Sequence, residues 1–322
     1  CLALGGIVIC SALYAVIGLV VMSVGTRWVE RLMPPVVTGA VVAVIGLNLA
    51  SIPIKNMAPT GFDAWMQAVT FVSIGVVAVF TTGMTRRLLI LVGLIAACLA
   101  YAALTNGLGW GKPIAGGLIA DAAWFGMPNF TAPVFEVRAI VLIAPVALIL
   151  VAENLGHLKA VGAMTGQDMD RHIGRAFLGD GVATMVSGGV GGTGVTTYAE
   201  NIGVMSATRI YSTALFVVAA LFAIVLGFSP KFGAVIHTIP LAVMGGISIV
   251  VFGLIAIAGA RIWVDNRVDF TDSRNLIVAA ITLVLGTGDF TLKFGDFAMG
   301  DIGTATFGAI ILNAVLSRGR GR

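Results

Sequence analysis

Charged side chains are scarce in this chain. Lysine, arginine, aspartate and glutamate make up 11% of its 322 residues, whereas 58% of the residues are apolar. Soluble domains carry about 25% charged residues, so this shortage predicts an integral membrane protein. The formal net charge of +4 does not indicate a nucleic-acid-binding protein, because the basic residues lie in short loops between apolar runs.

Cysteine and histidine are also rare, with three residues of each. Cys1, Cys10 and Cys98 all lie in apolar, helix-like runs, which favours small buried hydrophobic residues over a disulfide or a metal site. The sequence shows no cluster of metal ligands and no nucleophile–base pair. We therefore expect neither an enzyme nor a cofactor, and the expected coupling ion is a proton.

Apolar runs near the ~20 residues that a bilayer requires recur along the chain. They cover 2–24, 36–54, 66–81, 88–104, 137–158, 210–228, 241–260, 276–286 and 302–316, with shorter pieces at 176–187 and 232–237. Basic residues gather at 27–31, 86–87, 159–175, 261–274 and 318–322. With about eleven crossings, all five clusters fall on the cytoplasmic side, which predicts a multi-pass protein of the cytoplasmic (inner) membrane.

One stretch, Ser187 to Arg209, departs from this pattern. Five glycines lie between Gly188 and Gly194, and a β-branched patch and a short helix over 202–207 follow. Irregular backbone survives in a membrane only where it is buried in protein or lines a wet cavity. The stretch therefore predicts a broken helix at a substrate site, with Thr196 and Thr197 satisfying the backbone groups that the break frees.

Two acidic positions stand out. Glu153 lies within a spanning run, where a charge costs roughly 2.5–3.5 kcal/mol, and His157 is one helical turn away on the same face. We interpret this pair as a proton-coupling site facing a cavity; the alternative is a structural pair that tightens helix packing. Asn48, also in an apolar run, is interpreted as a bond between helices.

Glu200 and Asn201 follow the glycine-rich break. At the start of a half-helix their surroundings would include free N–H groups and the positive end of the helix dipole; the alternative is simple N-capping. Carboxylates at Glu153 and Glu200, on separate helices, are predicted to converge on one cavity and to accept two N–H donors from a planar heterocycle. A ligand without those donors would leave buried acceptors unpaired.

At these residues the chain resembles a known family. The run Glu200-Asn201-Ile202-Gly203-Val204-Met205-Ser206-Ala207-Thr208-Arg209 matches every fixed position of the signature of the nucleobase–ascorbate transporters (nucleobase:cation symporter-2). The stretch from Ala152 to His157 resembles the family's acid-bearing helix, and Pro240 to Gly246 its later gate helix. The resemblance covers essentially the whole chain and is closest to the uracil-permease branch.

The resemblance implies an all-α polytopic membrane protein of fourteen spans, built as two inverted repeats of seven, with substrate between two helices that short β-strands interrupt. By this template the sequence starts at the fourth helix, so we expect a fragment that lacks three helices. Residues 1–106 would complete the first repeat, 107–136 the extracytoplasmic connection and 137–322 the second repeat. Within the second repeat, core helices would cover about 137–228 and gate helices about 232–317.

The resemblance also assigns roles to single residues. It implies that Glu153 and Glu200 bind substrate and that His157, with Glu153, takes part in proton coupling. Phe252 stands where the uracil branch has a tyrosine near the base, and Ala199 where it has a glycine whose N–H contacts the base. Asn201 completes the substrate-binding set.

The expected function is proton-driven import of uracil or a related pyrimidine. Purine carriers of the family tend to have glutamine at the position of Glu200, so glutamate favours pyrimidines. The alternatives are a purine or xanthine carrier and an anion exchanger of the same architecture, although two carboxylates would repel an anion. The expected partners are the nucleobase, the lipid bilayer and a second copy in a homodimer, with no nucleic acid.

Overall fold

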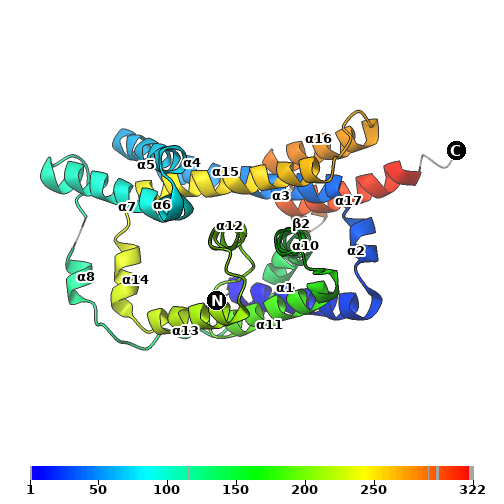
Figure 1. Ribbon diagram of the computed structural model, residues 1–322, viewed down its shortest axis with the longest axis horizontal. Coiled ribbons are helices and arrows are strands. Elements are labelled where there is room, and N and C mark those ends of the chain that lie inside the picture. The colour runs from blue at the N-terminus through cyan, green and yellow to red at the C-terminus, as the bar shows by residue number, and fades with distance from the viewer. Residues whose placement is uncertain (1, 115, 145, 289, 295–296, 319–322) are drawn as a thin grey trace. The chain divides into compact units, whose positions relative to one another are not determined.

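A computed structural model describes residues 2–114, 116–144, 146–288, 290–294 and 297–318 (Figure 1). These residues are helical except for loops and one antiparallel hairpin, β1 (Leu292–Phe294) with β2 (Phe297–Met299). The helices are α1 (Leu2–Val24), α2 (Arg27–Leu32), α3 (Pro35–Leu49), α4 (Ser51–Asn56), α5 (Gly61–Phe80), α6 (Gly83–Arg87), α7 (Leu89–Ala102), α8 (Gly117–Asp121), α9 (Val137–Ile143), α10 (Val146–Thr165), α11 (Ile173–Gly189), α12 (Ala199–Thr208), α13 (Thr213–Gly227), α14 (Pro230–His237), α15 (Leu241–Asp265), α16 (Ser273–Thr287) and α17 (Asp301–Arg318). Ala103–Gly107 (η1) forms a π-helix and Asp170–His172 (η2) a 3₁₀ turn.

Six of the described helices are long and apolar enough to cross a membrane. A seventh span is added if α13 and α14, which meet at a bend of 85°, are counted as one. The shorter apolar helices Ser273–Thr287 and Ile302–Ser317 fall below the length of a full span. The polytopic helical architecture is therefore confirmed, and the larger estimate of about eleven crossings counted such short segments as well.

The chain folds into two compact units. The first contains residues 1–48, 130–202 and 254–322, and the second contains 49–129 and 203–253. The boundary passes through α12 and α15, so each of these helices belongs to both units. The described residues of the first unit include the whole helix break and the acid-bearing helix α10.

Glycines bring α1 and α11 into close contact in the first unit, where the two helices run side by side (Figure 1). A Cβ added to Gly18 would lie 2.7 Å from the Leu178 nitrogen, and one added to Gly181 would lie 2.9 Å from the Ala15 nitrogen. Small residues of this kind allow helix backbones to approach in membrane proteins. The close approach brings Tyr14 onto Phe177, both of which are fully buried.

A second cluster in the same unit joins α3, α10, α16 and α17. The Asn48 side chain donates to the carbonyl of Gly286 at 2.8 Å, which confirms its interpretation as a bond between helices. The Trp263 indole of α15 donates to the Val36 carbonyl at 3.1 Å, across the close approach at Gly39. These polar contacts fix helices whose apolar surfaces alone give little directional preference.

The second unit packs α5 against α7 and the start of α15 through Met66, Tyr101 and Val243. The connection over 107–136 is mostly non-helical, apart from α8, as the sequence predicted. Trp124 of this connection is 73% exposed, and the Lys231 ammonium lies 4.7 Å from its ring centroid. An exposed aromatic next to a cation suits the membrane–water interface.

Candidate functional site

The helix break predicted between Ser187 and Arg209 is confirmed. α11 ends at Gly189, α12 begins at Ala199, and Arg209 ends α12 with a positive φ of 56°. Gly191 has a φ of 100°, and a Cβ there would lie 2.7 Å from the Thr131 nitrogen, so this position requires glycine. The predicted short strand differs from the structure: residues 192–198 are non-helical, but no strand within the described part of the chain pairs with them.

Side chains of α11, rather than a paired strand, hydrogen-bond to this non-helical segment. Thr184 donates to the Val195 carbonyl at 2.8 Å and accepts from the Val195 N–H at 3.3 Å. Ser187 donates to the Thr193 carbonyl at 2.7 Å. Asp180, Thr184 and Ser187 follow the i, i+4, i+7 spacing, so they share one face of α11.

Asn154 of α10 links three parts of the site. Its side chain is 2% exposed, and its amide nitrogen donates to Asp180 at 3.1 Å and to the Thr196 hydroxyl at 3.2 Å. Its oxygen accepts a hydrogen bond from the Thr197 hydroxyl. Both threonines thus hydrogen-bond to side chains, whereas the sequence predicted that they satisfy backbone groups freed by the break. Thr184 and Ser187 of α11 bind those backbone groups instead.

Glu153 and His157 lie one turn apart on the continuous helix α10, and both are half-buried. His157 Nδ1 lies 2.7 Å from the Thr197 hydroxyl. This threonine therefore touches both Asn154 and His157, so the predicted proton-coupling helix is directly connected to the helix break.

Ala199, Glu200 and Asn201 form the first turn of α12, as the sequence predicted for the start of a half-helix. The Asn201 N–H donates to the Tyr198 carbonyl at 3.1 Å, and Asn201 is exposed. The side chains of Ala199 and Glu200 lie outside the described residues. The predicted convergence of the carboxylates of Glu153 and Glu200 thus stays a prediction.

Phe252 lies on α15, is half-buried and belongs to the second unit, whereas the other candidate residues belong to the first. Its predicted contact with a base therefore also stays a prediction.

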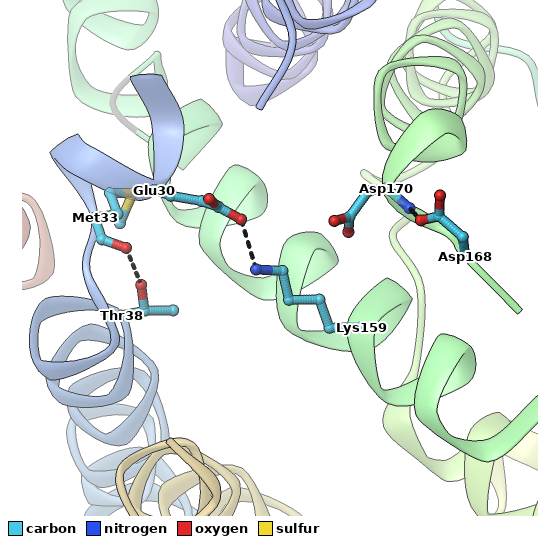
Figure 2. A network of polar contacts seen from close by, with 6 residues as sticks. All are labelled: Glu30, Met33, Thr38, Lys159, Asp168 and Asp170. Atoms are coloured by element: carbon cyan, nitrogen blue, oxygen red, sulfur yellow. Dashed lines mark hydrogen bonds and ion pairs between the residues drawn. The ribbon is translucent and has the colours of Figure 1, made fainter. Parts of the chain in front are cut away.

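An ion pair ties the far end of α10 to α2. Lys159 Nζ lies 2.6 Å from Glu30, with both side chains partly exposed (Figure 2). On α3, the Thr38 hydroxyl donates to the Met33 carbonyl at 2.9 Å. In the loop after α10, the Asp170 N–H donates to Asp168 at 3.0 Å. Of these contacts, the ion pair connects the acid-bearing helix α10 to α2.

Asp180 is the residue that the sequence reasoning missed. Its half-buried carboxylate interrupts the apolar segment 176–187, and its i+4 and i+7 neighbours are also polar. Helical spacing on α11 could have identified it. Among the described residues, no group of three or more histidine, cysteine or acidic residues could hold a metal ion.

Six or seven apolar spans among the described residues, with a polar network at a broken helix, are typical of a multi-pass membrane transport protein. Comparison with known families agrees: the model of the family described as "Permease family" (Xan_ur_permease) matches residues 2–294. The chain belongs to this permease family and is a transporter, not an enzyme.

Curated relatives match nearly the whole chain. "Putative pyrimidine permease RutG" of Escherichia coli K12 is 67% identical over 317 residues, which cover 98% of this chain and 72% of the relative. "Uracil permease" of Paenibacillus larvae is 38% identical over 320 residues, covering 96% and 75%. "Uracil permease" of Escherichia coli K12 is 35% identical over 319 residues, covering 97% and 74%.

Proposed function

We propose that the protein imports uracil or a related pyrimidine nucleobase across the cytoplasmic membrane in symport with protons. The observation that carries this proposal is the link through Thr197 between the acid-bearing helix α10 and the segment that leads into Glu200. The names of the relatives, a pyrimidine permease and several uracil permeases, support the substrate class.

In this proposal, Glu153 and Glu200 accept the two N–H donors of the pyrimidine. Ala199, in the first turn of α12, offers its backbone N–H near the helix N-terminus, where acceptor oxygens of the base would be favoured, and Asn201 offers its side-chain amide. Phe252 offers an aromatic face. A base that lacks either N–H would leave a carboxylate unpaired, which is the basis of discrimination.

Proton coupling would use Glu153 and His157. A proton on this pair removes part of the charge in the cavity and favours substrate loading. Because His157 contacts Thr197 at 2.7 Å, a change in its protonation reaches the segment before α12 through one hydrogen bond. Movement of core against gate helices would then expose the loaded site to the cytoplasm.

The proposal extends to the architecture. The proposed architecture is a seven-plus-seven inverted repeat, in which residues 1–106 belong to the first repeat, 107–136 form the connection and 137–322 form the second repeat. A homodimer is proposed with it.

Uptake of labelled uracil tests the proposal. Cells or proteoliposomes carrying the protein should accumulate uracil when the outside is acidic, and a protonophore should abolish the accumulation. Glu153→Gln and Glu200→Gln should each reduce uptake at least about tenfold, because each removes a charged hydrogen-bond acceptor worth roughly 1.5–3 kcal/mol. Glu136→Gln is the matched control, since Glu136 is an exposed acid outside the site.

Wild-type uptake in both site variants would contradict these roles. Competition by excess xanthine but not thymine would favour the purine carrier, and uracil-independent exchange of bicarbonate, chloride or sulfate would favour the anion exchanger.

A further inference from the structure

A chain of side-chain hydrogen bonds runs from Asp180 to His157 within the first unit. Asp180 of α11 accepts from the amide nitrogen of Asn154 at 3.1 Å, and the Thr196 hydroxyl accepts from the same nitrogen at 3.2 Å. The Thr197 hydroxyl donates to the Asn154 oxygen and lies 2.7 Å from Nδ1 of His157. Because every link needs one donor and one acceptor, the direction of the first bond decides the direction of the last.

The direction is fixed at Asp180. An ionised carboxylate only accepts hydrogen bonds, so the side of Asn154 that faces it is the amide NH₂ and not the carbonyl oxygen. The oxygen of Asn154 is therefore turned toward Thr197. A carbonyl oxygen carries no hydrogen, so this bond uses the single hydroxyl hydrogen of Thr197. Only the lone pairs of the Thr197 oxygen are left for His157.

The contact between Thr197 and His157 then has one polarity. The Thr197 oxygen accepts, so Nδ1 of the imidazole carries the hydrogen and donates it at 2.7 Å. In a neutral imidazole one nitrogen carries the hydrogen and the other the lone pair, and the hydrogen bond of one nitrogen sets the state of both. The neutral ring is thus the Nδ1–H tautomer, with its lone pair on Nε2.

Charge alone does not select the nitrogen. Glu153 lies one turn before His157 on α10, Asp180 lies on α11, and Lys159, further along α10, is paired with Glu30 at 2.6 Å. The helix α1, which also packs against α10, carries no charged residue. An acid near the ring favours the imidazolium whichever nitrogen takes up the proton. The hydrogen bond to Thr197, in contrast, distinguishes the two nitrogens.

We infer that Asn154 and Thr197 are positioning residues that hold neutral His157 as the Nδ1–H tautomer, so that a coupling proton adds at Nε2. One proton from the aqueous phase adds to the Nε2 lone pair and gives the imidazolium, and the Nδ1–H bond to Thr197 is kept. That bond becomes charge-assisted and roughly twice as strong. Proton uptake thereby tightens the link between α10 and the segment before α12. The role in transport rests on the proposed function, in which His157 takes part in proton coupling.

Nitrogen NMR of the protein labelled with nitrogen-15 histidine tests the tautomer without any substrate, and His157→Gln identifies the signals of the ring by their loss. At a pH where the ring is neutral, Nδ1 should give the signal of a protonated nitrogen and Nε2 that of an unprotonated one. Thr197→Val removes the acceptor and should give a mixture of tautomers, whereas Thr197→Ser keeps the hydroxyl and should keep the wild-type pattern. Thr196→Val is the matched control: the Thr196 hydroxyl binds the nitrogen of Asn154, outside the path to His157, so the tautomer should not change.

Asn154→Leu should reverse the tautomer. Leucine has a similar size but accepts no hydrogen bond, so the Thr197 hydroxyl is released and donates to Nδ1, and the neutral ring becomes Nε2–H. Asn154 is 2% exposed, and the two Thr197 variants decide the inference if Asn154→Leu does not fold. An unprotonated Nδ1 in the wild type, or an Nδ1–H ring that Thr197→Val leaves unchanged, overturns the inference.

Uracil uptake tests the role in transport. Thr197→Val should lower the rate of proton-driven uptake about two- to tenfold, the size of one net hydrogen bond, and Thr197→Ser should restore most of the rate. A wild-type rate in Thr197→Val would overturn the role in transport. Absence of uracil uptake by the wild type would instead overturn the proposed function, while the NMR spectra decide the tautomer.

Discussion

Thr184→Val tests whether α11 side chains hold the helix break. Thr184 is 4% exposed and binds both backbone groups of Val195, the carbonyl at 2.8 Å and the N–H at 3.3 Å. Valine has nearly the same shape but neither donates nor accepts. The substitution therefore removes both bonds while it leaves the packing of α11 almost unchanged.

The expected loss follows from those two groups. Leaving a buried donor or acceptor unpaired costs about 1–3 kcal/mol. Val195 itself is 42% exposed, so water reaches part of its backbone, and we expect a loss below the summed range of about 2–6 kcal/mol, about 1–3 kcal/mol in all. At about 2–4 °C per kcal/mol, Tm should fall by about 2–12 °C.

The assay is thermal unfolding of the purified protein in detergent, followed by tryptophan fluorescence. Thr282→Val is the matched control: Thr282 is also fully buried in the first unit, but its hydroxyl donates only to the Val278 carbonyl of its own helix at 2.6 Å. That carbonyl retains its helical N–H donor, so the control should lose less than about 1 kcal/mol. Equal Tm values for the two variants would refute the claim that Thr184 holds the backbone of the non-helical segment.

Two further predictions concern the helices around the site. Gly181→Ala should destabilise the protein by about 1–3 kcal/mol, because the added Cβ would lie 2.9 Å from backbone atoms of α1. Gly179→Ala is the control: a Cβ there would meet no atom within 4 Å, so this variant should be neutral or stabilising in the same unfolding assay. Lys159→Met should lower Tm only slightly, because the ion pair of Lys159 with Glu30 is partly exposed and worth under about 1 kcal/mol. In roughly 0.5–1 M salt, which screens exposed charges, the difference in Tm from the wild type should disappear. A difference in Tm that does not depend on salt would show that packing is responsible.

Much of the fold could be predicted from the sequence because hydrophobic length alone indicates a span. The first span was expected over 2–24 and α1 covers Leu2–Val24; the break and the short helix after it were also found. A cluster of glycines indicates irregular backbone without any knowledge of neighbouring helices. The interpretation of Asn48 succeeded for the same reason, since a lone amide in an apolar run needs a partner.

The contacts at the break could not be predicted in this way. A run of β-branched residues favours a strand, but a strand needs a second strand, and the sequence does not say which element lies alongside. The structure gives that place to α11, whose threonine and serine satisfy the backbone of 193–195. Asp180 was missed because the segment was judged by its average hydrophobicity rather than by the helical spacing of its polar residues.

Holding the break by side chains has a consequence for transport. A strand in a β-ladder is released only when several backbone bonds break together, whereas the bonds of Ser187, Thr184 and Asn154 to this segment belong to separate side chains and can exchange one at a time. Each exchange is small if another donor stands ready, since a net hydrogen bond is worth only about 0.5–1.5 kcal/mol. A permease must move its site at every cycle, so we expect the segment before α12 to be held in this stepwise manner. Variants that lock it, such as a disulfide between positions 184 and 195, should keep the protein folded and stop uptake, and reduction should restore uptake. Cys1, Cys10 and Cys98 would first be replaced by alanine.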